Sequence, residues 1–314
     1  MVRTGIPTLA LLLALVVSAS GQQWTVVELP DGPGPDVPKL LDMAVDGPVV
    51  WFSTELDGLM AYDGSQWVLH TQAEGGLRHD RYRHVMFVDA SGDKWTAKDG
   101  SLTIDRLDDG GTLFDKSDDV WTYYSKTSEL KSGRVFSMEQ DDLGNYWFGI
   151  RDEGGTETST LELLIDGDPA TTDDDQWLAY DYYDTTLFYN DDVRGLELDR
   201  DGRLWITYSR AGVDLWDFGE YDTYLDDTIV HFSEATGLPS DIVRDVHAAE
   251  DGRVWVGADG GLVVYDTTSE QWTRVDGIPG IRVNTIDSDA QGHIWVGTDE
   301  GAVMLFSSGE IAEV

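Results

Sequence analysis

The chain has 314 residues, no cysteine, and 60 acidic against 21 basic side chains, which gives a formal net charge of −39 at pH 7. Without cysteine, disulfides, thiolate metal sites and cysteine nucleophiles are excluded. The negative charge disfavours nucleic acids and anionic membranes as partners, because like charges repel over long range.

The first residues read as an export signal. Arg3 supplies a positive start, Ile6 to Val17 form an apolar core, and Ser18 to Gly21 are small. An apolar core of this length is too short to span a bilayer, which needs ~20 residues. We therefore expect residues 1–21 to be a signal peptide and residues 22–314 to form one domain. The mature protein should be secreted or periplasmic, with no membrane insertion.

Six of the 12 tryptophans close a recurring phrase that reads Asp-x-x-Gly-x-x-Trp in its best copies. Four copies are complete, the one ending at Trp255 has Ala249 in place of the Asp, and the one ending at Trp51 has Pro48 in place of the Gly. The six tryptophans are Trp51, Trp95, Trp147, Trp205, Trp255 and Trp295. Their spacing, roughly 40 to 60 residues, predicts repeated four-stranded units.

One repeat shows how such a unit is built. Short runs rich in β-branched and aromatic residues cover Val243–Ala248, Arg253–Gly257 and Leu262–Asp266, and a fourth run surrounds Trp272. Gly and Asp stand at the corners, as turns require. The sequence predicts an all-β fold, a six-bladed β-propeller in which the tryptophans pack between neighbouring blades.

The sixth repeat is expected to have no fourth strand of its own, because the sequence stops eight residues after Phe306. A matching segment, Gln23–Val27, lies at the other end and resembles Gln271–Thr273. Because an unpaired edge strand is an aggregation hazard, we expect this N-terminal strand to close the last blade.

One basic residue stands near the start of each first strand, 11 to 13 residues ahead of the repeat tryptophan. These residues are Lys39, Arg83, Arg134, Arg194, Arg244 and Arg282. The loops that enter the first strands of a propeller surround one mouth of its channel, so the pattern predicts a cationic ring that binds an anion. The alternative is that each cation pairs with a local acid such as Asp192, Asp241 or Asp245.

Two long loops are candidates for recognition on the same face. Thr71–Tyr82 carries Arg78, His79 and Arg81, and Asp181–Asp192 carries Tyr182, Tyr183, Phe188 and Tyr189. Exposed aromatics beside polar groups suit stacking on sugars, although the same aromatics can instead pack the loop onto its blade.

Cofactor and catalytic signals are weak. Asp166, Asp168 and Asp173–Asp175 could hold Ca²⁺, but they do not match the twelve-residue calcium loop, and a solvated acidic loop is the alternative. No other cofactor is expected. The histidines do not follow the repeat, and no Gly-x-Ser-x-Gly elbow is present, so no catalytic residue is assigned.

The clearest repeats carry a family resemblance. The segments Gly237–Arg244, Asp251–Gly257 and Gly261–Asp266 resemble the two-component regulator propeller repeat, and Gly277–Gly301 is a second good copy. The resemblance implies the propeller fold and a ligand-binding part of an extracytoplasmic sensor. The chain departs from that family because it lacks the transmembrane helix, kinase and regulator.

Three functions remain open. The first is a secreted, sensor-like propeller that binds an oligosaccharide or another anion at the channel mouth without catalysis. The second is an enzyme that resembles propeller lyases and lactonases, since Trp51–Thr54 is similar to phrases in virginiamycin B lyase. The third is a cell-surface scaffold that contacts other extracytoplasmic proteins. The acidic, Lys-poor composition resembles proteins of halophilic organisms and predicts that salt stabilises the fold.

Overall fold

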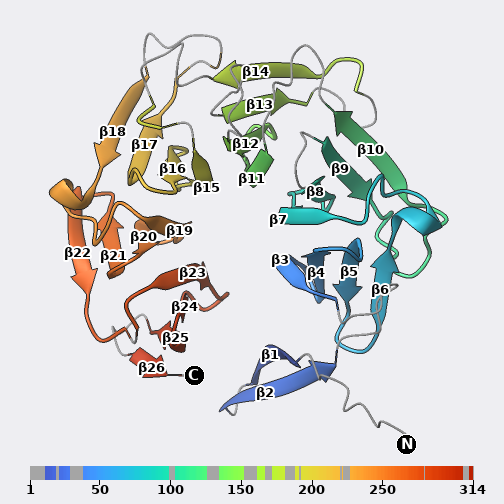
Figure 1. Ribbon diagram of the computed structural model, residues 1–314, viewed down its shortest axis with the longest axis horizontal. Coiled ribbons are helices and arrows are strands. Elements are labelled where there is room, and N and C mark those ends of the chain that lie inside the picture. The colour runs from blue at the N-terminus through green and yellow to red at the C-terminus, as the bar shows by residue number, and fades with distance from the viewer. Residues whose placement is uncertain are drawn as a thin grey trace, which may run out of the picture. The chain divides into compact units, whose positions relative to one another are not determined.

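The computed structural model describes residues 11–18, 21–28, 38–98, 103–125, 134–151, 161–166, 172–180, 188–190, 192–219, 221, 227–278, 280–306 and 311–313. This part of the chain is all-β, with two short 3-10 turns, η1 (Gln72–Glu74) and η2 (Glu234–Thr236). Six antiparallel four-stranded sheets follow one another in chain order, the blades of a six-bladed β-propeller (Figure 1). No helix in these ranges is long and apolar enough to cross a membrane.

The chain divides into two compact units, and the first comprises residues 1–99 and 104–123. It holds the hairpin β1–β2 and the first two blades, which pack through their first strands. The strands are β1 (Leu11–Ser18), β2 (Gly21–Glu28), β3 (Leu40–Asp46), β4 (Val49–Thr54), β5 (Leu59–Tyr62), β6 (Trp67–His70), β7 (Tyr82–Val88), β8 (Lys94–Lys98), β9 (Thr103–Asp108) and β10 (Val120–Ser125).

The second unit, residues 100–103 and 124–314, holds blades 3 to 6. Blade 3 is β11 (Arg134–Gln140), β12 (Tyr146–Arg151), β13 (Leu161–Ile165) and β14 (Gln176–Tyr180). Blade 4 is β15 (Val193–Leu198), β16 (Leu204–Tyr208), β17 (Val213–Asp217) and β18 (Thr228–Phe232). Blade 5 is β19 (Val243–Ala248), β20 (Arg253–Ala258), β21 (Gly261–Asp266) and β22 (Gln271–Val275). Blade 6 is β23 (Val283–Ser288), β24 (Ile294–Thr298), β25 (Gly301–Leu305) and β26 (Ile311–Glu313).

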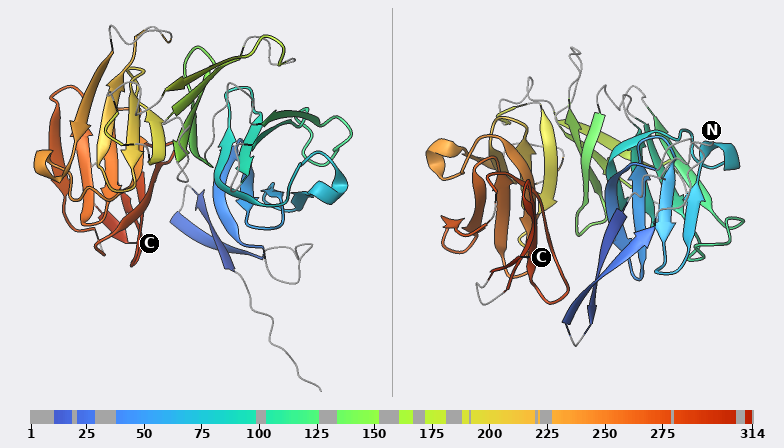
Figure 2. Two further views of the ribbon diagram at one scale, coloured as in Figure 1. Left: turned by 45° about the horizontal axis from the view of Figure 1, so that its top comes forward. Right: turned by 60° about the horizontal axis from the view of Figure 1, so that its bottom comes forward.

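The first strands of consecutive blades lie against one another along the second unit, β11 on β15, β15 on β19 and β19 on β23. Figure 2 shows the strands of each of these blades running side by side. Side chains from one first strand satisfy backbone N–H groups of the next. Asp245 Oδ2 accepts from the Ile286 N–H at 2.7 Å, and Glu197 Oε1 accepts from the Ala248 N–H at 2.8 Å. The first strand of each blade is an edge of its own sheet, and these side-chain hydrogen bonds satisfy some of its backbone groups although no sheet continues from one blade to the next.

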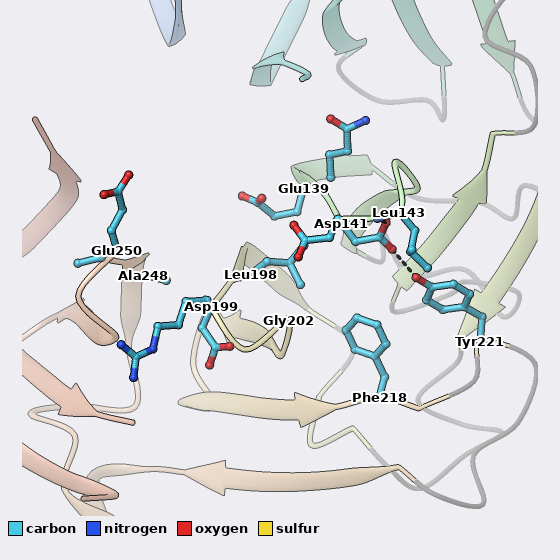
Figure 3. Close-up of a pocket in the computed structure, with 14 residues that line it drawn as sticks. Glu139, Asp141, Leu143, Leu198, Asp199, Gly202, Phe218, Tyr221, Ala248 and Glu250 are labelled. Atoms are coloured by element: carbon cyan, nitrogen blue, oxygen red, sulfur yellow. Dashed lines mark hydrogen bonds between the residues drawn. The ribbon is translucent and has the colours of Figure 1, made fainter. Parts of the chain in front are cut away.

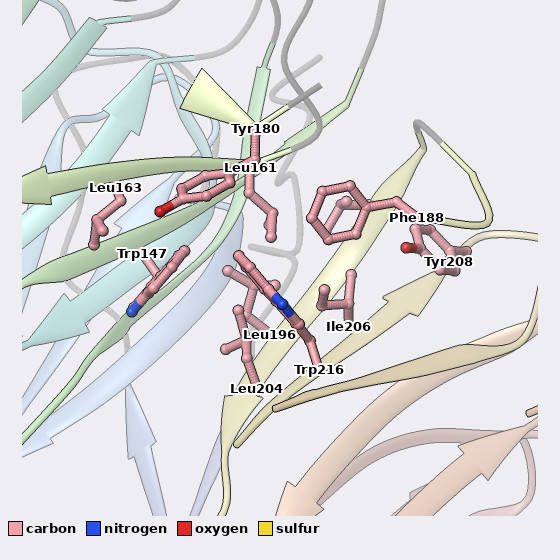
Figure 4. Close-up of a cluster of buried hydrophobic side chains, with 11 residues drawn as sticks. Trp147, Leu161, Leu163, Tyr180, Phe188, Leu196, Leu204, Ile206, Tyr208 and Trp216 are labelled. Carbon is pink, nitrogen blue, oxygen red and sulfur yellow. The ribbon is translucent and has the colours of Figure 1, made fainter. Parts of the chain in front are cut away.

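Five of the six repeat tryptophans are buried core residues, as expected, and the sixth, Trp295, is partly buried. Trp147 and Trp216 are almost fully buried in a cluster that joins blades 3 and 4, with their rings edge to face at a centroid separation of 5.4 Å (Figure 4). Trp205 has the same role between blades 4 and 5. Burial of such large apolar surfaces is the main stabilising term for blades that cannot bury their faces alone.

The Asp of the repeated phrase has a double role. Asp199 Oδ1 accepts the N–H groups of Asp201 and Arg203, which closes the turn, and its Oδ2 accepts the indole N–H of Trp205 at 3.0 Å. The pairs Asp89–Trp95 and Asp289–Trp295 repeat this indole bond at 2.8 and 3.1 Å. The phrase therefore links the turn directly to the core.

The closure predicted from the sequence is wrong in one respect. The outer strand of blade 6 is β26, whose Ile311 pairs with Leu305, and β2 pairs with β1 instead. The three-residue β26 carries no tryptophan and follows Phe306 by only a few residues, so the repeat pattern did not reveal it.

Candidate functional site

The six predicted cations are not equivalent in the structure. Arg194 and Arg244 each lie at the β-bulge of a first strand, where the register shifts between Val193 and Gly195 and between Val243 and Asp245. Arg134 is the first residue of β11, and Arg282 directly precedes β23. Each of these two arginines lies two residues before the bulge of its strand and not at the bulge itself. A bulge re-aims the side chain of its extra residue. Arg194 and Arg244 are thus a matched pair.

Lys39 and Arg83 belong to the first unit. Lys39 pairs with Glu55 at 3.2 Å and is 65% exposed, so this ion pair is weak. Arg83 lies in β7, and its side chain lies outside the described residues.

Side chains of the loop Thr71–Tyr82 bond to Asp105 of β9 in the same unit. Arg78 donates from Nε to Asp105 Oδ1 at 2.6 Å, and the Tyr82 hydroxyl donates to Asp105 Oδ2. Asp105 is fully buried. Arg78 is therefore a structural partner of a buried carboxylate.

Arg244 and Arg282 share one carboxylate. Arg244 Nε donates to Asp259 Oδ1 at 2.6 Å, and Arg282 Nε lies 3.2 Å from the same oxygen. The hydrogen bond from Arg244 is the main cause that holds the pKa of Asp259 below its usual range. This partner differs from Asp241 and Asp245, the acids that the sequence suggested.

Arg194 lies beside this pair and is half-buried. Its Nε donates to the backbone oxygen of Arg244 at 3.1 Å. Within the described residues, no carboxylate lies at ion-pair distance from the Arg194 guanidinium. Burial, followed by the charge of Arg244, lowers the pKa of Arg194 from its ordinary value, but the group stays protonated in the usual pH range.

Arg151, which sequence reasoning missed, extends the group. It is the cross-strand partner of Arg134, and its Nε lies 2.7 Å from Asp192 Oδ1. Like charges directly opposite in a ladder are unfavourable unless an anion lies near them. We call Arg134, Arg151, Arg194, Arg244 and Arg282 the arginine cluster.

Two apolar side chains stand next to the arginine cluster. Ile281 precedes Arg282 and is 75% exposed, and Ile242 lies two residues before Arg244 and is 36% exposed. Exposed β-branched residues beside guanidinium groups offer both an apolar contact and a charged one. The cluster can therefore bind a ligand that carries an anion on a partly apolar body.

The remaining predicted recognition elements are described in part. Phe188 is buried against Trp216, as the packing alternative requires, and Tyr189 stacks on His231 with ring centroids 3.6 Å apart. Tyr182 and Tyr183 lie outside the described residues, as does Asp168 of the acidic loop. Among the described residues, no group of three acids or histidines is arranged to hold a metal ion.

A second feature of the same unit is a pocket of about 440 Å³ beside the turns between first and second strands (Figure 3). Phe218 and Tyr221, from the segment that follows β17, form its aromatic wall, and Glu139 and Glu250 are among its acids. The Tyr221 hydroxyl donates to Asp141 Oδ2 at 2.7 Å. This pocket is acidic and aromatic, so its chemistry differs from that of the arginine cluster.

Comparisons with solved structures place the chain among known propellers. Virginiamycin B lyase from Staphylococcus aureus is 14% identical, with a TM-score of 0.62 over 88% of this chain and 84% of that one. PorZ, a surface component of the type-IX secretion system of Porphyromonas gingivalis, is 17% identical, with a TM-score of 0.64 over 96% of this chain and 44% of that one. The extracellular domain of the putative hybrid two-component system BT4673 from B. thetaiotaomicron is 17% identical, with a TM-score of 0.44 over 96% of this chain and 40% of that one.

At these identities the similarity shows the fold alone. No protein-family model and no curated protein matches the chain. The lyase and surface-protein similarities therefore agree on a β-propeller, and the function has to be argued from the residues of this chain.

Proposed function

We propose that the protein is a sensor-like, ligand-binding β-propeller that acts outside the cytoplasm and recognises an anionic oligosaccharide at the arginine cluster. The export-type N-terminus and the repeat resemblance favour the location. The proposal narrows the predicted ring of six cations to the cluster in the second unit, with Arg194 and Arg244 at its centre.

Arg194 is the observation that carries the proposal. The chain has almost three acids for each base, yet this half-buried guanidinium has no carboxylate at ion-pair distance among the described residues. Its described hydrogen bond is to a backbone oxygen. The charges of Asp245 and Asp192 act on this guanidinium only from beyond ion-pair distance. Removing a cation from water without a directly paired carboxylate costs free energy, so a site that keeps it suits an anion that arrives from outside.

Guanidinium geometry suggests the anion's class. Arg binds carboxylate, sulfate or phosphate through two parallel N–H donors. Asp259 occupies Nε of Arg244, and Arg282 Nε faces the same oxygen. Ile242 and Ile281 add apolar surface that can contact the C–H face of a sugar ring. A uronic acid or sulfated sugar meets both requirements.

Thermal shift in molar salt tests the proposal, with oligogalacturonate as the probe and a neutral galactan fragment as its uncharged counterpart. Saturating ligand at 100 times Kd should stabilise the folded state by about 2.7 kcal/mol. Arg194→Met should weaken binding of the acidic sugar at least about tenfold, since a charge-assisted hydrogen bond contributes roughly 1.5–3 kcal/mol.

Arg210→Met is the matched control, because Arg210 is exposed in the same unit and its replacement changes the net charge equally. It should bind like the unaltered protein. If Arg194→Met and Arg210→Met bind the acidic sugar equally well, the cluster is not the site. If neither acidic sugar nor inorganic sulfate stabilises any variant, the anion-binding function is wrong, and self-association at high concentration would instead favour a scaffold.

A further inference from the structure

Three polar side chains form a continuous row across the first strands of blades 4, 5 and 6. They are Glu197 on β15, His247 on β19 and Ser288 at the end of β23. All three lie in the second unit, so their relative placement belongs to one compact body. In their registers, Glu197 pairs with Trp205 and His247 pairs with Trp255, which makes the two equivalent positions of neighbouring repeats.

The distances within the row place the His247 ring between the carboxylate and the hydroxyl. His247 Nδ1 lies 3.3 Å from Glu197 Oε1, and His247 Nε2 lies 2.9 Å from Ser288 Oγ. Glu197 Oε1 is held in place because it also accepts the Ala248 N–H at 2.8 Å. With the proton on Nδ1 facing the carboxylate, Nε2 is the acceptor for the serine hydroxyl.

The charges around His247 favour that arrangement. Burial lowers the pKa of His247, but the hydrogen bond and charge of Glu197, with the charges of Asp287 and Asp245, outweigh it and raise the pKa above its ordinary value. Glu139 of β11 lies near Glu197 in turn, and burial and Glu197 raise the pKa of Glu139 well above its usual range. The imidazole is thus a stronger base than a free histidine.

Ser288 is accessible from a pocket. A cavity of about 420 Å³ is lined by the turn Ala249–Asp251 and by Ser288–Gly292. Ser288 and His247 are only partly buried, with 15% of the His247 side chain exposed. Glu250, Asp251 and Asp289 line the pocket. Their negative charges repel an anionic substrate, so the pocket suits a neutral or cationic substrate.

We propose that Ser288, His247 and Glu197 form a nucleophile, base and positioning carboxylate that hydrolyse a neutral ester or lactone. Ser288 Oγ attacks the carbonyl carbon as His247 Nε2 takes its proton, and the tetrahedral intermediate expels the alcohol, which receives that proton. Water then attacks the carbonyl carbon of the acyl-serine ester while His247 Nε2 takes a proton from that water. His247 passes this proton to Ser288 Oγ as the acid leaves. The net reaction is ester plus water to acid plus alcohol.

A fluorophosphonate probe tests the nucleophile, with mass spectrometry to locate the label on the full chain in molar salt. The unaltered protein should be labelled at Ser288, and Ser288→Ala should lose the label while keeping its melting temperature within a few degrees. Ser269→Ala, an exposed serine on the turn before β22, should label like the unaltered protein. His247→Asn should label at least about a hundredfold more slowly, as expected when a general base is removed.

Glu197→Gln separates positioning from a merely structural role. The labelling rate should rise with pH as His247 loses its proton, and the midpoint of that rise should move to lower pH in Glu197→Gln because the carboxylate that raises the pKa of His247 is gone. A folded protein that is not labelled at Ser288, or a rate that His247→Asn leaves unchanged, would overturn the proposal. Arg194→Met should label normally, so this proposal and the anion-binding function can fail separately.

Discussion

The hydroxyl of Tyr221 donates to Asp141 Oδ2 at 2.7 Å and so takes the oxygen that binds the repeat tryptophan in blades 2, 4 and 6. The indole N–H of Trp147 is buried and has no hydrogen-bond partner among the described residues. Phe218 covers the Trp147 ring, with centroids 4.9 Å apart. In blade 3, the Asp–indole hydrogen bond of blades 2, 4 and 6 is thus replaced by the Tyr221–Asp141 bond, which holds Tyr221 in the aromatic wall of the pocket.

This exchange predicts unequal effects of two substitutions. Asp141→Ala removes the acceptor for the N–H groups of Leu143 and Asn145 as well as for Tyr221, and should cost about 2–3 kcal/mol of unfolding free energy. Tyr221→Phe should cost less than about 1 kcal/mol, because Asp141 keeps its turn bonds and its Oδ2 still accepts the side-chain amide of Asn145 at 3.1 Å. Urea unfolding in molar salt measures both. Equal losses would mean that the Tyr221 bond, and not the turn, dominates the contribution of Asp141.

Opposite pH dependences are expected from two aspartates of blade 5. Loss of hydration raises the pKa of Asp245 from 3.8 to about 7, so the folded state binds the extra proton between these values. Stability from this group is therefore greatest at low pH and falls as pH rises to about 7, by at most about 1.4 kcal/mol per pH unit. Asp245→Asn should raise the melting temperature at pH 8 and flatten its dependence on pH.

Asp259 is the matched case with the opposite sign. The hydrogen bond from Arg244 lowers its pKa, so its contribution is present above the unfolded pKa and is lost as pH falls through the folded one. Asp259→Asn should lower the melting temperature at pH 8 and have little effect at acid pH. Melting curves from about pH 2 to pH 8 at constant molar salt compare the two variants, because the folded pKa of Asp259 lies below 3.8. A common direction of change at pH 8 would contradict this assignment.

The repeat made most of the fold predictable, since each phrase specifies a turn and a buried indole together. Elements outside the phrase were not predictable in this way. Ile311–Glu313 forms an outer strand by backbone pairing with β25, which needs no tryptophan. The spacing between each cation and its Trp, 11 residues for Arg194 and Arg244 but 13 for Arg134 and Arg282, was in the sequence, yet its meaning depends on the bulge.

The site depends even more on long-range pairing. Arg151 joins the arginine cluster because β12 returns alongside Arg134, and Asp259 lies beside the cluster because its backbone bridges to that of Arg282. Glu197, His247 and Ser288 are 50 and 41 residues apart in the chain, and only the stacking of first strands brings them together. Charge and residue type alone cannot reveal such neighbours.

Two glycines with the same backbone angle separate conformational strain from steric clash. Gly202 has φ of 76° and Gly212 has φ of 75°, a region that other residues avoid. A Cβ at Gly202 would meet no atom within 4 Å, whereas at Gly212 it would overlap the backbone oxygen of Phe232. Gly202→Ala should cost about 1–2 kcal/mol and Gly212→Ala about 3 kcal/mol or more, as measured by urea unfolding. Similar losses would show that the β17–β18 contact relaxes freely.

Salt should change stability more than any single substitution. The net charge of −39 makes the folded chain repel itself, and screening shortens the range of that repulsion from about 10 Å at 0.1 M to about 3 Å at 1 M salt. We expect the melting temperature to rise steeply between 0.1 and 1 M NaCl and to level off above that range. Sucrose at equal osmolality is the control, because it strengthens burial without screening charge. An equal rise in sucrose would assign the effect to solvent exclusion, whereas a rise specific to salt would assign it to the acidic surface.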